Sequence, residues 1–190
     1  MIRILTSYWG SFTQDSGYSP IPNAKERFWD CVIIDMLINN NDRNEDNWGV
    51  IKCRKSSSYR LAPVFDCGNC FYGKTDEERI AKILDDETRL FSSALNGITA
   101  YEDDEEKRIR NSEILLLDNS DLRQSIIRVY ELVKDKLAEI NRFIDDVPSD
   151  YDGLLIMSEE RKRFYKETLR LRFVHLLEPQ YLALKNERKE

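Results

Sequence analysis

Three polar side chains in the middle of the chain have the types and the spacing to hold a metal ion. Asp42 and Asn47 are separated by four residues, and Asp66 follows two strand-like stretches later, directly before Cys67-Gly68. Mg²⁺ prefers hard oxygen ligands, takes few of them from the protein, and completes its shell with phosphate oxygens and water. Two carboxylates and a carboxamide on turns therefore predict a magnesium site suited to phosphate chemistry.

The pattern D-x-x-x-x-N followed by D-x-G is also the layout of a kinase catalytic loop and its metal-binding aspartate. In that layout the first aspartate orients or deprotonates the acceptor hydroxyl, and the asparagine and the second aspartate hold the metal. The spacing alone is weakly specific, because polar loops produce it often. The alternative is a solvated loop whose side chains cap the backbone.

The flanking residues make the pattern more specific. An apolar helix runs directly into Leu37–Gly49, which reads LINNNDRNEDNWG, and residues 61–66 read LAPVFD. These two stretches resemble the catalytic segment of HipA-like serine/threonine kinases, N-x-D-R-[HN]-x-x-N, and that family's strand-to-metal segment, L-[AT]-P-x-[YF]-D. The combined resemblance covers residues 24–72 and is far more specific than either half.

The resemblance implies a role for each matching residue. Asp42 and Arg43 are the catalytic candidates, Asp42 as the base and Arg43 as a brace of the loop. Asn47 and Asp66 would bind the cofactors, holding Mg²⁺ against the phosphates of ATP. Asn44 stands where the family commonly has histidine, at a position that does not touch the metal. The implied reaction transfers the ATP γ-phosphoryl group to a serine or threonine hydroxyl of a protein substrate.

The chain departs from the family in the part that clamps the phosphates. A complete kinase needs a glycine-rich loop and a strand lysine paired with a helix glutamate. Only Gly10 and Gly17 precede the catalytic loop, no G-x-G-x-x-G occurs, and the V-I-K of residues 50–52 follows that loop. We expect a C-lobe whose N-lobe is absent from this chain, with a separate N-lobe or an antitoxin-like chain as a partner. The alternatives are a non-catalytic, protein-binding remnant and a lipid or small-molecule kinase-like fragment.

The elements that position these residues follow from the hydrophobic pattern. It predicts a mainly α (α+β), protein-kinase-like C-lobe with one small β-hairpin. Residues 24–38 form an apolar helix, buried on most sides, with Asn23 as its N-cap. Residues 48–53 and 59–64 form the hairpin.

From residue 75 onward the chain is predicted to be mostly helical. Apolar residues at steps of three and four from Leu122 to Ile144 predict a long amphipathic helix, with Ser120 as its cap. A second helix begins at Ser158 and is stopped or kinked at Pro179. The highly charged residues 101–113 are expected to form a loop or an exposed helix.

Length and charge limit the classes of protein to which the chain can belong. The chain has 190 residues and a net charge of −6, so direct nucleic-acid binding is not expected. No segment approaches the roughly 18 apolar residues of a membrane span, and the first residues lack a signal peptide's apolar core. A cytoplasmic protein follows, with no membrane partner. We divide it into an irregular arm (1–23), a kinase C-lobe-like domain (24–184) and a frayed tail (185–190).

The cysteines offer one further hypothesis. Cys67 and Cys70, with Cys53 nearby, have the spacing of a zinc or redox motif. The fourth zinc ligand would have to be Cys31, inside the apolar helix, or the distant His175. Small buried or half-exposed reduced thiols are therefore the favoured interpretation.

Overall fold

The computed structural model describes residues 21–56, 58–103 and 105–187, so the predicted arm lies almost wholly outside the described residues. The helices are α2 (Ala24–Ile38), α3 (Glu77–Leu84), α4 (Glu87–Leu95), α5 (Asn111–Ile114), α6 (Ser120–Asp146), α7 (Glu159–Arg172) and α8 (Glu178–Glu187). Short 3₁₀ turns span Glu45–Asn47 and Cys70–Tyr72, and a π-helical turn spans Phe173–Leu177. The strands are β1 (Val50–Lys52), β2 (Tyr59–Leu61), β3 (Ile98–Glu102), β4 (Arg108–Arg110), β5 (Asp150–Tyr151) and β6 (Leu154–Leu155).

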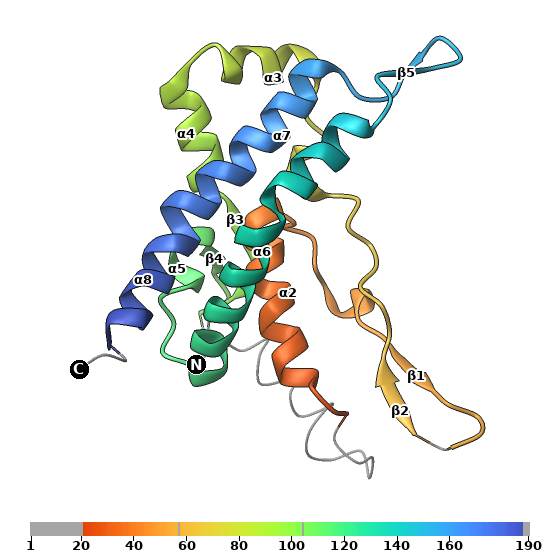
Figure 1. The fold of residues 1–190 in the computed structure, drawn as a ribbon, viewed down its shortest axis with the longest axis vertical. Helices are drawn as coiled ribbons and strands as arrows, with labels where there is room; N and C mark the ends of the chain where they lie inside the picture. The colour runs from red at the N-terminus through yellow and green to blue at the C-terminus, as the bar shows by residue number, and fades with distance from the viewer. Residues whose placement is uncertain (1–20, 57, 104, 188–190) are drawn as a thin grey trace.

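The mainly helical class is confirmed, but the number of hairpins is not one. The described part of the chain contains three separate two-stranded antiparallel sheets: β1–β2, β3–β4 and β5–β6. The β1–β2 hairpin is the predicted one, with Val50 opposite Leu61, and it is shorter at both ends than expected. It projects away from the helices in Figure 1.

Helix α2 is the centre of the fold and confirms the predicted apolar helix. It packs against α6 and α7 (Figure 1), and Trp29, Ile33 and Met36 are at most 1% exposed. Asn23 occupies the N-cap position as predicted, but it has a left-handed backbone and its side chain makes no capping hydrogen bond. Asn39, also left-handed, ends the helix, so the chain turns sharply into the polar segment.

Helices α6 and α7 pack along α2 and confirm the two predicted amphipathic helices. Helix α7 starts where predicted, and Ser158 is its cap, since its side chain accepts a hydrogen bond from the Arg161 N–H. The cap of α6 lies one residue before the predicted Ser120. The side chain of Asn119 accepts hydrogen bonds from the N–H groups of Asp121 and Leu122, at 2.9 and 3.0 Å.

We expect Asn119→Ala to lower the free energy of unfolding by about 1 kcal/mol, because two N–H groups at the start of α6 lose their acceptor. Ser120→Ala is the matched control and should have a smaller effect, since Ser120 lies inside the helix. Urea denaturation of both variants measures the difference. Equal losses would show that Asn119 is not the energetically important cap.

The last helical segment continues past Pro179 rather than stopping there. The irregularity is the π-helical turn Phe173–Leu177, just before α8 begins at Glu178. Pro179 closely follows this turn in a backbone that stays helical from Glu159 to Glu187, so the irregular hydrogen bonding lies where the proline removes a donor. The predicted frayed tail is wrong for residues 185–187, which belong to α8, while residues 188–190 lie outside the described part.

The charged segment 101–113 was expected to be a loop or an exposed helix, and this is wrong for most of it. It contains the end of β3, all of β4 and the start of α5. Thr99, Tyr101 and Ile109 point inward and are buried, while their neighbours carry the charges. The Thr99 hydroxyl donates to the Ile109 carbonyl oxygen at 2.9 Å.

No helix among the described residues is long and apolar enough to cross a membrane.

Candidate active site

The polar loop after α2 is held by Asp35, a buried carboxylate within that helix. Arg43 donates from Nε to Asp35 Oδ2 and from Nη2 to Asp35 Oδ1, both at 2.8 Å. Asn40 Nδ2 also donates to Asp35 Oδ1, at 2.9 Å. Both charged side chains are at most 4% exposed. The hydrogen bonds from Arg43 to Asp35 raise the pKa of Arg43 above its ordinary value in spite of burial.

Arg43 also reaches the segment that carries Asp66. Its Nη1 donates to the Phe65 carbonyl oxygen at 2.8 Å, and its Nη2 lies 3.5 Å from Cys67 Sγ. The guanidinium of Arg43, which belongs to the polar loop, therefore contacts α2 and both sequence neighbours of Asp66, namely Phe65 and Cys67. The arrangement places Arg43 as the brace between the two halves of the predicted site.

The two candidate metal ligands contact each other. Asn47 Nδ2 donates to Asp66 Oδ2 at 2.6 Å, and Asn47 Oδ1 accepts the Asn44 N–H at 2.9 Å. Asn47 is buried, whereas Asp66 is exposed and has a left-handed backbone with a φ of 56°. These bonds fix the orientation of the Asn47 amide, and the second Asp66 oxygen accepts no hydrogen bond within the described residues.

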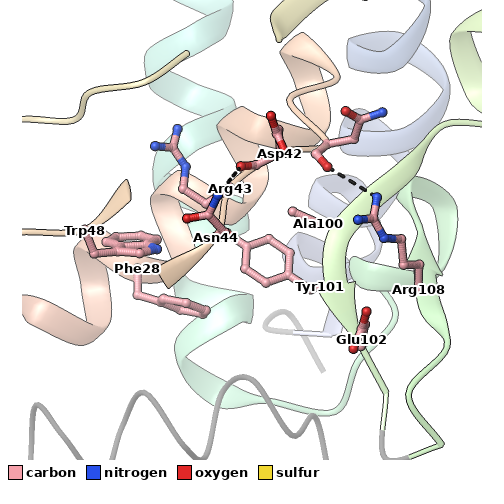
Figure 2. A pocket seen from close by; sticks show the side chains of 10 residues that line it. Phe28, Asp42, Arg43, Asn44, Trp48, Ala100, Tyr101, Glu102 and Arg108 are labelled. Atoms are coloured by element: carbon pink, nitrogen blue, oxygen red, sulfur yellow. Dashed lines mark hydrogen bonds between the residues drawn. The ribbon is translucent and has the colours of Figure 1, made fainter. Parts of the chain in front are cut away.

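Asp42 lies on the other side of this loop. Its side chain is exposed and borders a pocket with Asn41 and Asn44 (Figure 2). No described residue donates a hydrogen bond to its carboxylate. The structure thus brings Asn47 and Asp66 together directly, whereas Asp42 borders a pocket whose lining includes neither of them.

The donor set fits a magnesium ion that is shared with a phosphate. Asp66 carries carboxylate oxygens and Asn47 an amide oxygen, which are hard ligands. In this structure the Asn47 amide turns its nitrogen toward Asp66 and its oxygen toward the Asn44 N–H, so the amide would have to turn to share a metal ion with Asp66. The described ranges contain no group of three or more histidine, cysteine or acidic side chains able to hold a metal ion. Two protein ligands would therefore leave most of the coordination shell to phosphate oxygens and water.

The cysteines lie in unlike environments. All four are free thiols. Burial raises the pKa of Cys31 to about 11 and that of Cys70 to about 12, so both remain protonated at neutral pH. Cys53 is exposed on the hairpin and Cys67 is exposed next to Asp66. His175 is exposed and meets the ring of Phe91 edge-on.

Sequence reasoning missed two side chains that support the site. Asp35 did leave a signal, because a carboxylate on an otherwise buried helix needs a partner. Arg172 left none. It is fully buried and donates to the carbonyl oxygens of Leu37 and Ala94, each at 2.9 Å, and to the Tyr72 hydroxyl at 3.2 Å. Desolvation lowers the pKa of Arg172 from its ordinary value.

Comparison with known proteins adds an independent observation. No family model matches the chain. It is 32% identical over 139 residues to the serine/threonine-protein kinase CtkA of Helicobacter pylori, covering 72% of this chain and 40% of CtkA. The crystal structure of the H. pylori proinflammatory kinase CtkA matches with a TM-score of 0.84 and 26% identity, over 97% of this chain and 64% of that chain.

The chain therefore spans less than two thirds of the length of the relative it matches. The aligned part still includes nearly all of this chain in the structural comparison. The chain is homologous to the serine/threonine kinase CtkA, and its mainly helical fold matches part of that kinase.

Proposed function

We propose that the chain is the catalytic lobe of a HipA-like serine/threonine protein kinase, which transfers the γ-phosphoryl group of ATP to a protein hydroxyl in a magnesium-dependent reaction. The observation that carries this proposal is the Arg43 anchor. Arg43 is held by a buried ion pair with Asp35, and its hydrogen bond to the Phe65 carbonyl oxygen ties the loop of Asp42 and Asn47 to the segment of Asp66. Homology to a serine/threonine kinase supports it.

Each residue then has a defined task. Asp42, whose carboxylate is free, would accept a hydrogen bond from the acceptor hydroxyl and take its proton. Asn47 and Asp66 would hold Mg²⁺ from one side while ATP phosphate oxygens coordinate it from the other. The metal ion would supply charge neutralisation at the transferred group. Arg43 would keep these side chains in register without contacting the reacting atoms.

The proposal includes a partner for the surface around the metal ligands. Val50, Ile51, Val64 and Phe65, which flank Asn47 and Asp66 in the sequence, are 36–45% exposed. We propose that these apolar side chains contact an N-lobe, supplied by the same polypeptide or by another one such as an antitoxin-like chain. That lobe would clamp the phosphates. We place the catalytic lobe at residues 24–184 and the protein in the cytoplasm.

Calorimetric titration with Mg·ATP tests the proposed metal site. We expect binding that needs magnesium and that falls by about 10–100-fold in Asp66→Ala, since charge-assisted contacts contribute about 1.5–3 kcal/mol. Asp46→Ala is the matched control, because Asp46 is exposed in the same loop and should bind as the original chain does.

Two results would contradict the site. One is binding that persists without magnesium, and the other is equal affinity in Asp66→Ala and the original chain. If the chain alone binds nothing, the titration is repeated with a longer chain that includes an N-lobe. Continued absence of binding would favour the protein-binding remnant instead.

A further inference from the structure

A pocket of about 220 Å³ opens beside Asp42. Its walls come from α2, from the loop after α2 and from the β3–β4 hairpin (Figure 2). Asn47 and Asp66 are not part of its lining. The pocket therefore adjoins the proposed catalytic base but lies apart from the proposed metal ligands, where an acceptor rather than a nucleotide would lie.

One wall of the pocket is formed by aromatic rings that pack against one another. The rings of Phe28 and Trp48 stack at 5.5 Å with an interplanar angle of 27°, and Phe28 meets Tyr101 edge-on at 5.8 Å. Phe28 and Tyr101 are buried, which fixes the geometry of the wall, and Trp48 is half-buried. Aromatic faces attract cations as well as apolar groups.

The charges at the pocket favour a cation. The carboxylates of Asp42 and Glu102 accept no hydrogen bond and form no ion pair within the described residues. Two guanidiniums also line the pocket. Arg43 is neutralised by its buried ion pair, and the exposed Arg108 donates to a backbone carbonyl oxygen at 3.4 Å. The pocket thus carries two carboxylates, those of Asp42 and Glu102, and one solvated positive charge, that of Arg108.

We propose that this pocket takes an arginine or lysine side chain of the acceptor segment, so that a basic residue adjoins the hydroxyl presented to Asp42. The apolar stem would lie along the aromatic wall and the charged head would reach Glu102. This assignment rests on the proposed kinase function, because it treats the pocket as part of the acceptor site.

Other occupants fit less well. An acidic or phosphorylated segment would meet Asp42 and Glu102 with like charge. A purely apolar side chain would cover the aromatic wall but would remove water from two carboxylates without replacing their hydrogen bonds. A basic side chain can pack its apolar stem against the aromatic wall and pair its charge with the carboxylates.

Peptide binding without nucleotide tests the inference separately from catalysis. The probes are three acetylated, amidated peptides of sequence Gly-Gly-X-Ser-X-Gly-Gly, in which X is arginine, norleucine or glutamate. The indole N–H signal of Trp48 in a nitrogen-15 NMR titration reports occupancy. We expect the arginine peptide to bind about tenfold or more tightly than the norleucine peptide and the glutamate peptide to bind weakest.

A pair of matched variants tests the role of Glu102. Glu102→Gln should weaken the arginine peptide by about fivefold or more while leaving the norleucine peptide unchanged. Glu105→Gln removes the same charge from an exposed position beyond the end of β3, where Glu105 pairs with Lys107, and it should not alter binding. An arginine preference that survives in Glu102→Gln would overturn the assignment.

Two further results would also overturn it. One is equal or tighter binding of the norleucine peptide, and the other is a Trp48 signal that no peptide perturbs. The Mg·ATP titration keeps the two proposals apart. Arginine-peptide binding in a chain that never binds Mg·ATP would leave a basic-ligand pocket and reject the kinase role, whereas the reverse result would reject only the pocket.

Discussion

Replacing Asp35 with alanine is expected to lower the free energy of unfolding by about 3–5 kcal/mol, because it leaves the buried Arg43 guanidinium without its counter-charge. Asn40 loses an acceptor in the same step. The loss should appear as a lower midpoint in urea denaturation. It should also abolish Mg·ATP binding, since Arg43 connects α2 to the segment of Asp66.

Two comparisons separate this effect from a general cost of removing a carboxylate. Asp30 lies on the same helix and pairs with Arg128 near the surface, at 2.6 Å. Asp30→Ala should cost only about 0–1 kcal/mol. The double variant Asp35→Leu/Arg43→Met should recover much of the stability lost in Asp35→Ala, because it removes both buried charges, but not the binding of Mg·ATP. A loss below 1 kcal/mol in Asp35→Ala would show that the pair does not hold the loop.

Replacing Asp42 with asparagine is expected to lower the rate of phosphoryl transfer by about 10²–10⁴-fold, the usual contribution of a general base. Mg·ATP affinity should not change, because Asp42 does not contact the metal-ligand pair of Asn47 and Asp66. Single-turnover transfer of labelled phosphate to a serine-containing acceptor protein measures the rate. The assay uses the chain together with an N-lobe if one is required.

The control for this prediction is Asp46→Asn, which makes the same chemical change at an exposed position in the same loop and should retain the full rate. The pattern that supports the assignment is a lost rate with intact nucleotide binding. If Asp42→Asn transfers phosphate as fast as the original chain, Asp42 has no role as the base. If it also loses Mg·ATP, its role is in folding of the loop.

The parts of the fold that could be predicted from the sequence depend on local patterns. Helix α2, the β1–β2 hairpin and α7 with its Ser158 cap each follow from residues within one element. The β3–β4 hairpin was missed although its buried residues alternate with exposed ones as in a strand, because its strands are only 5 and 3 residues long and the charged composition of the segment resembles that of an exposed loop. The missed cap at Asn119 is a one-residue error in a correctly predicted helix.

The same distinction between local patterns and long-range contacts applies to the candidate site. Asp42, Asn47 and Asp66 are visible in the sequence because their spacing and flanking segments form a motif. Their support is not visible, since the partner of Asp35 is a side chain beyond the end of the helix and the partners of Arg172 come from distant segments. A motif can indicate the candidate site residues, whereas the side chains that hold them in place become visible only in the three-dimensional structure.

The bonds made by Arg172 also bear on the order in which the chain folds. Asp35 and Arg43 are only eight residues apart, so their ion pair closes a short loop. Arg172 lies 135 residues from Leu37 and 78 from Ala94, and contacts across such separations form slowly because closure entropy must be overcome first. We therefore expect the segment after α2 to gain this support only when α7 docks. A polypeptide truncated before Arg172 would carry every residue of the motif and still lack the carbonyl contact that fixes the end of α2.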